Sequence, residues 1–474
     1  MNDLGVIGMG VMGLNLAMNA AEKGFKVAVY NRTTARMLSA VDVAKKDSLT
    51  LDGHEKMADF VTSLKEPRKV LLLVKAGAAV DATLGELLEL LKPSDIVIDC
   101  GNEFYENTDR RSSLAGQKGI VFFGMGVSGG EKGARYGPAM MPGGTRETYD
   151  QLAPILTKIA AQSSTGPCVG FMGKGSAGNY VKMVHNGIEY GDMQLIAEAY
   201  SILRSGLCPA KDPADVFAEW NKGRMASYLI EITETVLRTP HPDNHQKKLV
   251  DDVLDVAGSK GTGKWTVQEA CEKGVPCPTI QAALDSRYLS GFTARPAFFQ
   301  TFGASSPAVA GNLSLAEVET ALYLSKLCSY AQGLSLIDAA SEVHQYGVDL
   351  KEVARCWTGG CIIRAELLKW IMQAYEQNKP PNMLLAPRFA QEFTPQAVAD
   401  WKKVVALAAE QGIPVPAMAA SLNYYLTLST ANLPLNLVQA QRDFFGAHTF
   451  KLKSDHGNSI KHADWETGTF TIAP

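Results

Sequence analysis

The stretch LGVIGMGVMGLNLAMNAAEKGFKVAVY, residues 4–30, decides the fold of the first part of this chain. Leu4 to Gly8 reads as a buried strand, Val11 to Lys23 as a helix, and Lys26 to Tyr30 as a second strand. A strand, a helix and a strand in this order predict the first unit of an α/β fold with a parallel sheet.

The turn GMGVMG within this stretch carries three glycines, Gly8, Gly10 and Gly13, at the spacing of a dinucleotide-binding loop. The first permits a tight turn, the second lets a pyrophosphate approach the backbone, and the third lets the helix pack on the strand. Free N–H groups at the start of the helix then bind phosphate. We therefore expect the cofactor to contact Gly8, Met9, Gly10, Val11, Met12 and Gly13.

The end of the second strand indicates which dinucleotide binds. An acidic residue normally stands there to bind the ribose hydroxyls of NAD, but this chain has Asn31, Arg32 and Thr33, with Arg36 following. An arginine attracts a ribose phosphate, and no carboxylate repels it. The sequence therefore predicts NADP rather than NAD. The alternative is that Arg32 is a surface arginine in a turn.

Further buried strands are expected at Lys69 to Val74, Asp95 to Asp99 and Ile120 to Gly124. They alternate with helical stretches at Ala78 to Leu91 and Glu106 to Lys118. This alternation predicts a parallel sheet with helices on both faces, whose ligands bind beyond the carboxyl ends of the strands.

Three loops follow those strand ends: VKAG, CGN and GVSGGEKGARYGP, at residues 74–77, 100–102 and 126–138. The first two supply further expected cofactor residues, Val74, Lys75, Ala76 and Asn102. In the third, Ser128, Gly129 and Gly130 can present backbone N–H groups and a hydroxyl to an anionic substrate. A flexible turn without a ligand is the alternative for this tripeptide.

From about Asn179 to Leu433 the hydrophobic period becomes helical, so we expect a boundary between Gly175 and Gly178. We predict a nucleotide-binding domain at residues 1–176, an all-helical domain at 177–433 and a tail at 434–474. An internal duplication of the helical domain is suggested by two sets with matching spacing: Val216, Trp220 and Gly223, and Val353, Trp357 and Gly360.

The stretch GSKGTGKW, residues 258–265, nearly spells a nucleoside-triphosphate loop. Trp265 stands where a serine or threonine should bind magnesium, and the preceding LVDDVLDVA has the pattern of an amphipathic helix instead of a buried strand. We therefore reject ATP or GTP binding. A glycine-rich turn that brings Lys260 to a substrate stays open.

In NYVKMVHNGIEYGD, residues 179–192, five polar side chains fall on one face of a predicted helix. They are Lys182, His185, Asn186, Glu189 and Tyr190. One explanation is a solvated surface opposite a core stripe. The other is a row of functional groups, and the rest of the chain has to decide between them.

Bulk properties describe an ordinary globular protein. A chain of 474 residues is too long for one core, and 46% hydrophobic with 20% charged residues is typical of folded domains. A net charge of -3 gives no reason to expect nucleic acid. No apolar run approaches the roughly 18 residues that span a bilayer, and no signal-like leader precedes the first strand. We expect no membrane contact and a cytoplasmic location.

No metal site is evident. The eight cysteines are scattered, and the nearest pairs, Cys271 with Cys277 and Cys356 with Cys361, lack metal-knuckle spacing. We expect them to be reduced and mostly buried. The two histidines of TPHPDNH, residues 239–245, stand in a proline-broken stretch that reads as a polar loop.

Taken together, these motifs resemble 6-phosphogluconate dehydrogenase, of the 3-hydroxyacid dehydrogenase superfamily, over nearly the whole chain. The resemblance rests on GMGVMG, YNRTT, VKAG, SGGEKGARYGP, KMVHNGIEY, GSKGTGKW and QRDFFGAH, in that order. It implies NADP-dependent oxidative decarboxylation of 6-phosphogluconate to ribulose 5-phosphate and carbon dioxide, without a metal, in a homodimer of the pentose phosphate pathway.

The resemblance also implies residue roles. Lys182 is the general base, Glu189 the acid that later protonates the enediol, and Asn186 a further catalytic residue. The sugar acid is held by Asn102, Ser128, Gly129, Gly130, His185 and Asn186. Its phosphate is held by Tyr190, Lys260 and Arg287, and by Arg442 and His448 of the other subunit's tail. Departures from the family pattern occur at Gly10, Cys100 and Glu103.

The spacing of the two proton-handling groups suits this chemistry. Seven residues of helix span about 10 Å, so Lys182 and Glu189 can address different carbons of one sugar acid. Lowering a lysine pKa from about 10.4 to about 7 requires roughly 4 to 5 kcal/mol of preference for the neutral amine. Because an ionised Glu189 opposes that shift, we expect Glu189 to be neutral when Lys182 acts as base.

Two alternatives stay open. A 3-hydroxyacid dehydrogenase for an unphosphorylated substrate has the same use for Lys182 and Asn186, but none for Arg287, Arg442 and His448. A non-catalytic NADP-binding protein needs no proton-handling pair.

Overall fold

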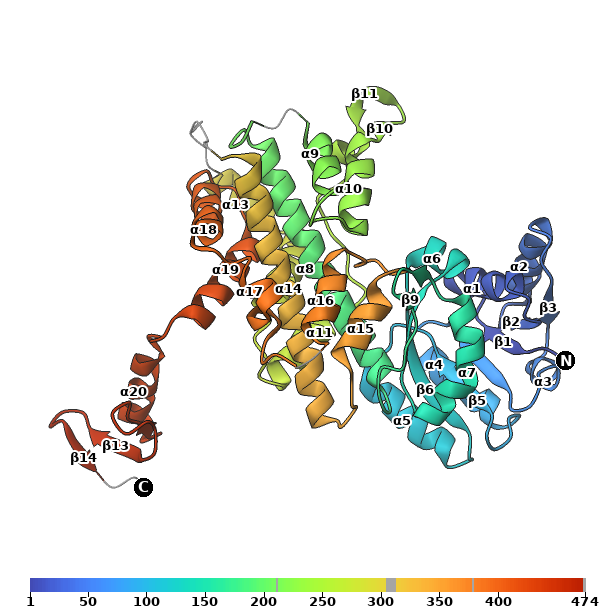
Figure 1. Cartoon of the computed structure of the whole chain (residues 1–474). Helices are drawn as coiled ribbons and strands as arrows, with labels where there is room; N and C mark the ends of the chain where they lie inside the picture. The colour runs from blue at the N-terminus through green and yellow to red at the C-terminus, as the bar shows by residue number, and fades with distance from the viewer. Residues whose placement is uncertain (210–211, 304–312, 377–378, 472–474) are drawn as a thin grey trace. The chain divides into compact units, whose positions relative to one another are not determined.

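The computed structural model describes residues 1–209, 212–303, 313–376 and 379–471. The chain divides into two compact units, Met1–Ser421 and Leu422–Pro474. The first unit contains an α/β domain followed by helices. The second begins within the helix Pro416–Ser429 and adds one further helix and a small sheet (Figure 1).

A seven-stranded sheet organises the α/β domain. Its strands are β1 (Leu4–Ile7), β2 (Val27–Tyr30), β3 (Leu51–His54), β4 (Lys69–Leu72), β5 (Ile96–Asp99), β6 (Val121–Ser128) and β7 (Ala139–Pro142). They lie in the order β3-β2-β1-β4-β5-β6-β7, and Val6 of β1 pairs in parallel with Val29 of β2 and Leu71 of β4. The strand order reverses beside β1, as in doubly wound dinucleotide-binding domains.

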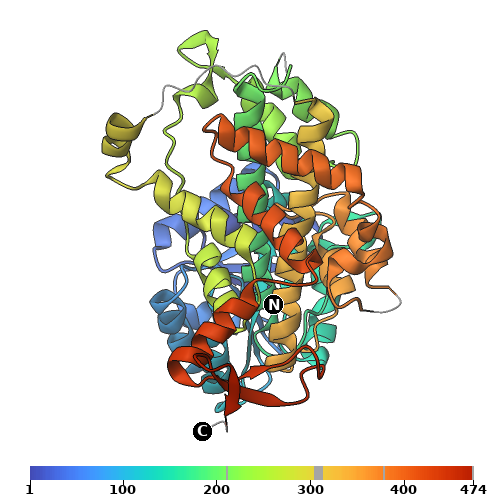
Figure 2. The ribbon, with the colours of Figure 1, turned by 90° about the vertical axis from the view of Figure 1, so that its left-hand side faces the viewer.

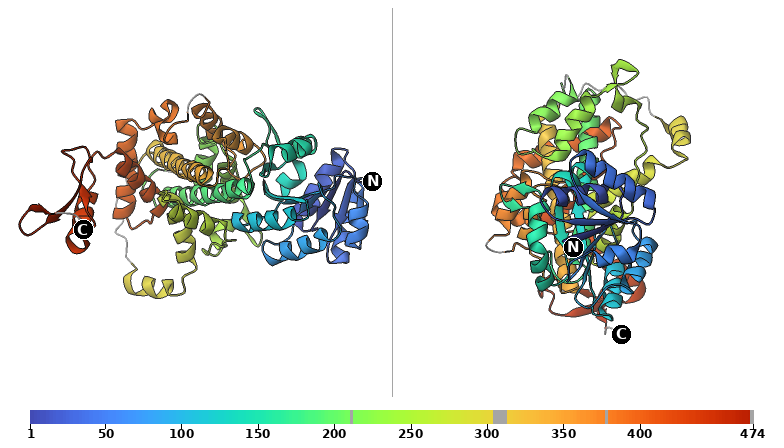
Figure 3. Two further views of the ribbon diagram at one scale, coloured as in Figure 1. Left: turned by 90° about the horizontal axis from the view of Figure 1, so that it is seen from below. Right: turned by 90° about the vertical axis from the view of Figure 1, so that its right-hand side faces the viewer.

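Helices cover both faces of this sheet (Figure 3). One face carries α1 (Val11–Glu22), α2 (Thr34–Lys46) and α7 (Arg146–Ile159), and the other carries α3 (Met57–Thr62), α4 (Ala78–Leu88) and α5 (Tyr105–Gly116). Successive strand residues point to opposite faces, so Val6 packs in the first layer and Ile7 in the second. The predicted α/β fold is confirmed.

The predicted strands all pair in parallel, but the sheet has an edge strand, β7, that the sequence did not predict. β7 pairs antiparallel with β6, with Val127 opposite Met140. Only residues 129–138 connect the two strands, and they include the short helix α6 (Gly130–Tyr136). A parallel crossover needs a dozen or more residues, so this connection is too short for one. β3 was not predicted either, because LDGH is short and half polar.

Helices dominate the rest of the chain. In chain order they and the minor elements between them are β8 (Gln162–Ser163), β9 (Gly166–Pro167), α8 (Ala177–Arg204), α9 (Pro213–Trp220), α10 (Tyr228–Arg238), β10 (Pro240–His241), β11 (Asn244–Lys248), η1 (Leu249–Asp252), α11 (Thr262–Glu272), α12 (Pro278–Ser290), α13 (Arg295–Phe302), α14 (Leu315–Val343), α15 (Leu350–Trp357), α16 (Leu367–Ala374), η2 (Met383–Leu385), α17 (Pro387–Ala390), α18 (Pro395–Glu410) and α19 (Pro416–Ser429). The long helices α8 and α14 run side by side (Figures 1 and 2). α8 also packs on β6 and β7, so it connects the two domains of this unit.

Two short helices repeat the same design. α9 and α15 each have eight residues, begin after a capping aspartate, Asp212 or Asp349, and end at a tryptophan, Trp220 or Trp357. α9 follows α8 and α15 follows α14, which have 28 and 29 residues. This repeated order supports the internal duplication that we propose for the helical domain.

The helix expected in LVDDVLDVA, residues 249–257, does not form. The structure has only the turn η1, and the chain after it is irregular. Val253 and Leu254 remain 64% and 76% exposed. An amphipathic pattern becomes a stable helix only when its apolar face packs on something, and here that face meets no partner. The polar loop expected at TPHPDNH contains most of a small hairpin, β10 with β11.

The second unit has a polar centre. It contains α20 (Leu435–Gly446) and the strands β12 (Phe450–Lys451), β13 (Ile460–Asp464) and β14 (Thr469–Thr471). Among residues 434–471, only Asp443 and Ala463 are buried. Asp443 accepts hydrogen bonds from the backbone N–H groups of Thr449 and Ala463 and from Nε1 of Trp465. A buried carboxylate therefore holds this unit together in place of an apolar core.

Candidate active site

A cavity of about 390 Å³ lies at the carboxyl ends of β1, β2 and β4. Seven expected cofactor residues line it: Gly8, Gly10, Asn31, Arg32, Thr33, Val74 and Lys75. The other expected residues do not line this cavity: Met9, Val11, Met12, Gly13, Ala76 and Asn102. Its position beside the reversal of strand order is where this class of sheet binds its ligands.

The glycine turn has the geometry that a pyrophosphate requires. Gly8 has a φ of +102°, and an added Cβ on Gly13 would lie 1.8 Å from the Gly8 carbonyl oxygen. Both positions therefore need glycine. An added Cβ on Gly10, in contrast, would meet nothing within 4 Å, so open space lies over this peptide. The residues present fit a dinucleotide.

Asn31 fastens the glycine turn to the second strand. Its Oδ1 accepts a hydrogen bond of 3.0 Å from the N–H of Met9, and its Nδ2 donates to the carbonyl of Thr33. The side chain of Asn31 thereby orders both loops at the cavity. Arg32 and Arg36 line the same cavity and supply positive charge where a ribose phosphate would lie.

Sequence reasoning missed the wall opposite these loops. Four residues of α4, at positions 79, 82, 83 and 86, line the cavity. Their spacing is that of one helix face. Two of the four are alanines, so this face has no polar pattern by which the sequence could indicate a ligand. Glu86 belongs to this wall and is the one acidic residue among those lining the cavity.

The polar stripe of α8 does not face solvent. Lys182, His185, Asn186 and Tyr190 are all buried, and the Glu189 side chain keeps 21% of its exposure. The explanation of these residues as a solvated helix surface is therefore wrong. Close packing of α8 on the sheet buries this face, and it requires Gly126 of β6, where an added Cβ would lie 2.3 Å from the Cβ of Lys182.

Lys182 is hydrogen-bonded within the stripe. Its Nζ donates to Oδ1 of Asn186 at 2.8 Å and lies 3.4 Å from Nδ1 of His185. Asn186 in turn donates from Nδ2 to Oγ1 of Thr262 at 3.1 Å and to Oδ1 of Asn102 at 3.5 Å. Three segments of the chain, α8, the start of α11 and the loop after β5, therefore meet around one amine.

His185 links this amine to the SGG loop. Its Nε2 lies 3.3 Å from Oγ of Ser128, and the ring packs edge-on against Trp357 at 5.5 Å between centroids. Burial lowers the pKa of His185 well below its usual range, and nearby Lys182 lowers it further. The imidazole is therefore neutral at physiological pH.

The loop after β6 is held from the other side by the turn before α16. Gly129 has a φ of +120°, and an added Cβ there would lie 2.4 Å from the carbonyl oxygen of Gly360. Gly130, with a φ of +61°, begins α6. The backbone of this loop thus needs glycine for both conformation and space, and it is more than a flexible turn.

Tyr190 organises the far end of the stripe. The Arg287 guanidinium stacks 3.4 Å from the centroid of its ring, and its hydroxyl lies 3.2 Å from Oγ of Ser259. Arg287 also donates to the carbonyl of Gly258 at 2.9 Å. Lys260, the next residue after Ser259, is exposed on the same loop. The structure therefore brings Tyr190, Arg287 and the Lys260 loop together.

Sequence reasoning missed Ser259, Thr262 and Trp357. The first two belong to GSKGTGKW, which was considered only for phosphate binding and for Lys260. Their contacts with Tyr190 and Asn186 join residues more than 60 positions apart. No local pattern encodes such a pairing.

Burial shifts both proton-handling groups toward neutrality. It lowers the pKa of Lys182 below its ordinary value of 10.5, with Glu189 opposing the shift. It raises the pKa of Glu189. The positive charges of Lys182 and Arg287 oppose this rise, and the charge of Asp192 reinforces it. Desolvation disfavours the charged form of each group and outweighs their mutual attraction.

The described residues contain no group of three or more histidine, cysteine, aspartate or glutamate side chains placed to hold a metal ion. No helix in the described part of the chain is long and apolar enough to cross a bilayer. None of the eight cysteines, all of which lie in the described part of the chain, forms a disulfide, and all but Cys271 are buried, as predicted.

Two family profiles cover nearly the whole chain. The profile of the NAD binding domain of 6-phosphogluconate dehydrogenase matches residues 3–173, and that of the C-terminal domain of 6-phosphogluconate dehydrogenase matches residues 178–465. The chain belongs to the 6-phosphogluconate dehydrogenase family.

Named members of this family align from end to end. The chloroplastic 6-phosphogluconate dehydrogenase, decarboxylating 1, of Arabidopsis thaliana is 47% identical over 98% of this chain and 97% of its own length. The enzyme of Synechococcus elongatus is 48% identical over 98% of this chain and 99% of its own. The solved structure of Plasmodium falciparum 6-phosphogluconate dehydrogenase matches with a TM-score of 0.93 and 45% identity, over 98% of this chain and all of that one.

Gly10, Cys100 and Glu103 are the residues at which the sequence predicts departures from the family pattern, and the structure gives the surroundings of each. Gly10 stands in open space. Cys100 is buried, and its Sγ lies 3.6 Å from the carbonyl of Ile98. Glu103 is also buried and accepts a hydrogen bond from the N–H of Gly77, in the cofactor loop. The hydrogen bond between Gly77 and Glu103 fixes the end of the loop at residues 74–77.

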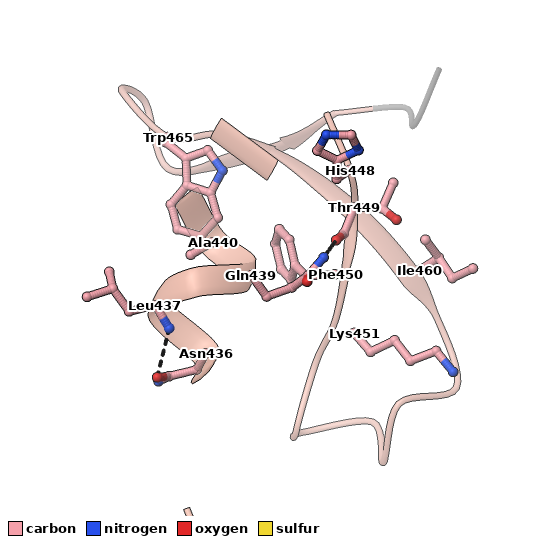
Figure 4. Close-up of a pocket in the computed structure, with 10 residues that line it drawn as sticks. All are labelled: Asn436, Leu437, Gln439, Ala440, His448, Thr449, Phe450, Lys451, Ile460 and Trp465. Atoms are coloured by element: carbon pink, nitrogen blue, oxygen red, sulfur yellow. Dashed lines mark hydrogen bonds between the residues drawn. The ribbon is translucent and has the colours of Figure 1, made fainter. Parts of the chain in front are cut away.

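The tail residues expected at the phosphate lie in the second unit. Arg442 of α20 is exposed and donates to Oε1 of Gln439 at 2.9 Å. His448 lines a cavity of about 810 Å³ between α20 and the small sheet (Figure 4). Leu437, Phe450, Ile460 and Trp465 make most of that lining apolar.

Proposed function

We propose that this chain catalyses the NADP-dependent oxidative decarboxylation of 6-phospho-D-gluconate to D-ribulose 5-phosphate, carbon dioxide and NADPH, in the pentose phosphate pathway. The observation that carries the proposal is a buried lysine and a largely buried glutamate, Lys182 and Glu189, on one face of the helix that packs against a dinucleotide-binding sheet. The Plasmodium falciparum relative is described with NADP+ as cofactor and 6-phosphogluconate as substrate.

Lys182 handles the first proton. It removes the proton of the carbon 3 hydroxyl, and the oxidised nicotinamide, when bound, supplies the acceptor for the hydride of that carbon. The resulting 3-keto acid loses its carboxylate as carbon dioxide because the ketone accepts the electron pair. Lys182 then returns its proton to the ketone oxygen, which gives an enediol. Glu189 protonates the carbon that carried the carboxylate, and Lys182 takes the hydroxyl proton back as the ketone forms again.

The starting state needs a neutral amine and a protonated carboxyl. The directions of both pKa shifts support it, since burial lowers that of Lys182 and raises that of Glu189. Asn186 orients the amine through its Oδ1, and Thr262 and Asn102 hold Asn186 in turn. Asn186 is thus a positioning partner of Lys182 as well as a substrate contact.

The substrate extends along the stripe. Its carboxylate end and hydroxyls are held by Asn102, Ser128, Gly129, Gly130, His185 and Asn186, and its phosphate by Tyr190, Lys260 and Arg287. The stacking of Arg287 on Tyr190 supports the phosphate site, because it presents a guanidinium for bidentate binding. Lys260 adds a flexible positive charge from the same side.

The activity is tested by mixing the protein with NADP and 6-phosphogluconate and following the absorbance of the reduced nicotinamide. We expect turnover, carbon dioxide release and a higher kcat/KM with NADP than with NAD, because Arg32 and Arg36 line the cavity. Turnover of 3-hydroxyisobutyrate but not of 6-phosphogluconate would support the unphosphorylated alternative. Turnover of neither would support a non-catalytic NADP-binding protein.

We also propose a homodimer in which each tail reaches the partner subunit. Exposed aromatic residues of the tail support this, since Phe444, Phe445 and Phe470 are 63%, 72% and 58% exposed. Exposed apolar patches of this size mark contact surfaces. Arg442 and His448 would then complete the phosphate site of the partner.

Mixing two inactive variants tests the tail exchange. Lys182→Met removes the general base and Arg442→Ala removes a tail residue. If tails cross, a mixed dimer has one site with both residues intact, so an equal mixture after subunit exchange regains about a quarter of the wild-type sites. If each tail serves its own subunit, the mixture stays inactive, which refutes the exchange.

The proposed division into residues 1–176, 177–433 and 434–474 is supported by the start of α8 at Ala177 and of α20 at Leu435. We also propose a cytoplasmic location. Eight cysteines without a disulfide among them support a reducing compartment. Fractionation of cells that produce the protein tests the location, and recovery with organelles would contradict it.

A further inference from the structure

The cofactor loop, residues 74–77, ends at a residue whose two backbone polar groups are both held by side chains. The N–H of Gly77 donates to Oε2 of Glu103 at 2.8 Å, and its carbonyl accepts from Nη2 of Arg111 at 3.0 Å. Gly77 has a φ of +86° and directly precedes α4. Two side chains from a later part of the chain therefore fix the end of this loop.

Glu103 is buried, and both of its oxygens are used. Oε2 accepts from Gly77 and from Nη1 of Arg111 at 2.6 Å. Oε1 accepts from the N–H of Phe104 at 2.9 Å and from Nδ2 of Asn107 at 3.0 Å. Burial by itself raises the pKa of Glu103, but these hydrogen bonds outweigh burial and the pKa is lowered. The carboxylate is ionised at neutral pH.

Arg111 completes the cluster. It is fully buried, and its Nε and Nη2 donate to the two carboxylate oxygens of Asp81 at 2.9 and 3.1 Å. Asp81 belongs to the first turn of α4 and Arg111 to α5. The hydrogen bond from Arg111 holds the pKa of Asp81 at about 2. A bidentate pair therefore locks α4, which forms one wall of the cofactor cavity, to α5.

The same cluster reaches the substrate site through one peptide bond. Glu103 directly follows Asn102, whose Oδ1 accepts from Nδ2 of Asn186 at 3.5 Å. Asn186 accepts from Lys182. A continuous series of contacts thus runs from the cofactor loop to the reactive amine.

We propose that Glu103 is a positioning residue that couples the cofactor loop to the loop of Asn102, residues 100–102, so that each ligand stabilises the arrangement that the other requires. The inference rests on the proposed function for the identity of the two ligands.

Three variants separate this role from simple stability. Glu103→Ala removes the tether, and Glu103→Gln keeps the volume of the side chain if the alanine variant folds poorly. Asn107→Ala removes a contact to Oε1 but leaves the bond to Gly77. Glu106→Ala, an exposed glutamate in the first turn of α5, is the matched control.

The first measurement is binding of NADPH, titrated with and without saturating 6-phosphogluconate, a pair that cannot turn over. In the wild type the ratio of the two dissociation constants departs from one. In Glu103→Ala we expect NADPH to bind about tenfold more weakly and the ratio to move toward one. Glutamine gives a smaller change, and the variants at Asn107 and Glu106 keep the wild-type ratio. A wild-type ratio of one, or an unchanged ratio in Glu103→Ala, overturns the proposal.

The second measurement needs no ligand. Hydrogen exchange of the Gly77 amide should quicken at least about tenfold in Glu103→Ala and stay unchanged in Glu106→Ala. Equal exchange in both overturns the tether itself. Failure of the wild type to oxidise 6-phosphogluconate would refute the proposed function. The hydrogen-exchange measurement would still decide whether Glu103 holds the Gly77 amide.

Discussion

Helix α8 and the tail unit distribute their side chains in opposite ways. α8 buries ionisable groups such as Lys182, Asp192 and Glu198, while the tail exposes Phe444 and Phe445. Burying a charge destabilises a fold unless the charge is paired or neutralised. Exposing large apolar groups leaves a surface that another surface can cover. The comparison teaches that α8 gives up stability to bury ionisable groups, and that the tail presents apolar side chains that the proposed dimer would cover.

The largest expected effect concerns the chemistry of α8. Lys182→Met should lower kcat by roughly 10³-fold to 10⁴-fold, because it removes the group that both takes and returns a proton. NADP binding should stay within about twofold, since Lys182 does not line the cofactor cavity. Steady-state kinetics and cofactor titration check both expectations. Lys174→Met, an exposed lysine just before α8, is the control. A near-normal rate in Lys182→Met would remove Lys182 from the mechanism.

The next effect concerns the tail. Phe444→Asp should weaken dimerisation about 10³-fold, since both tails of the dimer lose a phenylalanine that contributes about 2 kcal/mol. Sedimentation at several protein concentrations measures the association constant. Leu38→Asp on α2, at a residue 50% exposed in the nucleotide domain, serves as the control. A dimer of unchanged affinity would mean that Phe444 faces solvent in the assembly. The exposed apolar side chains of the tail would then not be explained by association.

The sequence predicted those features whose contacting residues lie close together in the chain. The glycine turn was predictable because strand, turn and helix are neighbours in the chain, and Gly8 and Gly13 contact each other. The stripe on α8 was predictable as a face, but its burial was not. Burial follows from the approach of β6, which depends on Gly126, more than 50 residues earlier.

The failures have the same cause. The contacts of Thr262 with Asn186 and of Ser259 with Tyr190 join distant segments, so no spacing in the sequence announces them. The helix expected at residues 249–257 had the right pattern but no surface to pack on. Local patterns therefore predicted elements and motifs, and tertiary packing decided which of them form and meet.

A third prediction sharpens the statement that α8 is destabilised by its own lysine. The pKa of Lys182 is lowered in the folded chain, so the unfolded chain binds more protons between that lowered value and 10.5. Stability therefore rises with pH across this window, and the full penalty is present below it. Lys182→Met should unfold at a higher temperature than the wild type at pH 7, with a difference that shrinks toward pH 10.5. A lower melting temperature at pH 7 would mean that the hydrogen bond to Asn186 outweighs burial.

The smallest effect is expected in the glycine turn. Gly10→Ala should change the NADP dissociation constant by less than about threefold, because the added Cβ meets nothing within 4 Å and Gly10 has an ordinary φ of -80°. Gly13→Ala is the matched opposite, since its Cβ would lie 1.8 Å from the Gly8 carbonyl oxygen. That variant should lose NADP binding or fail to fold. Equal behaviour of the two alanine variants in cofactor titration and thermal unfolding would contradict the turn geometry, because one methyl group enters open space and the other enters backbone.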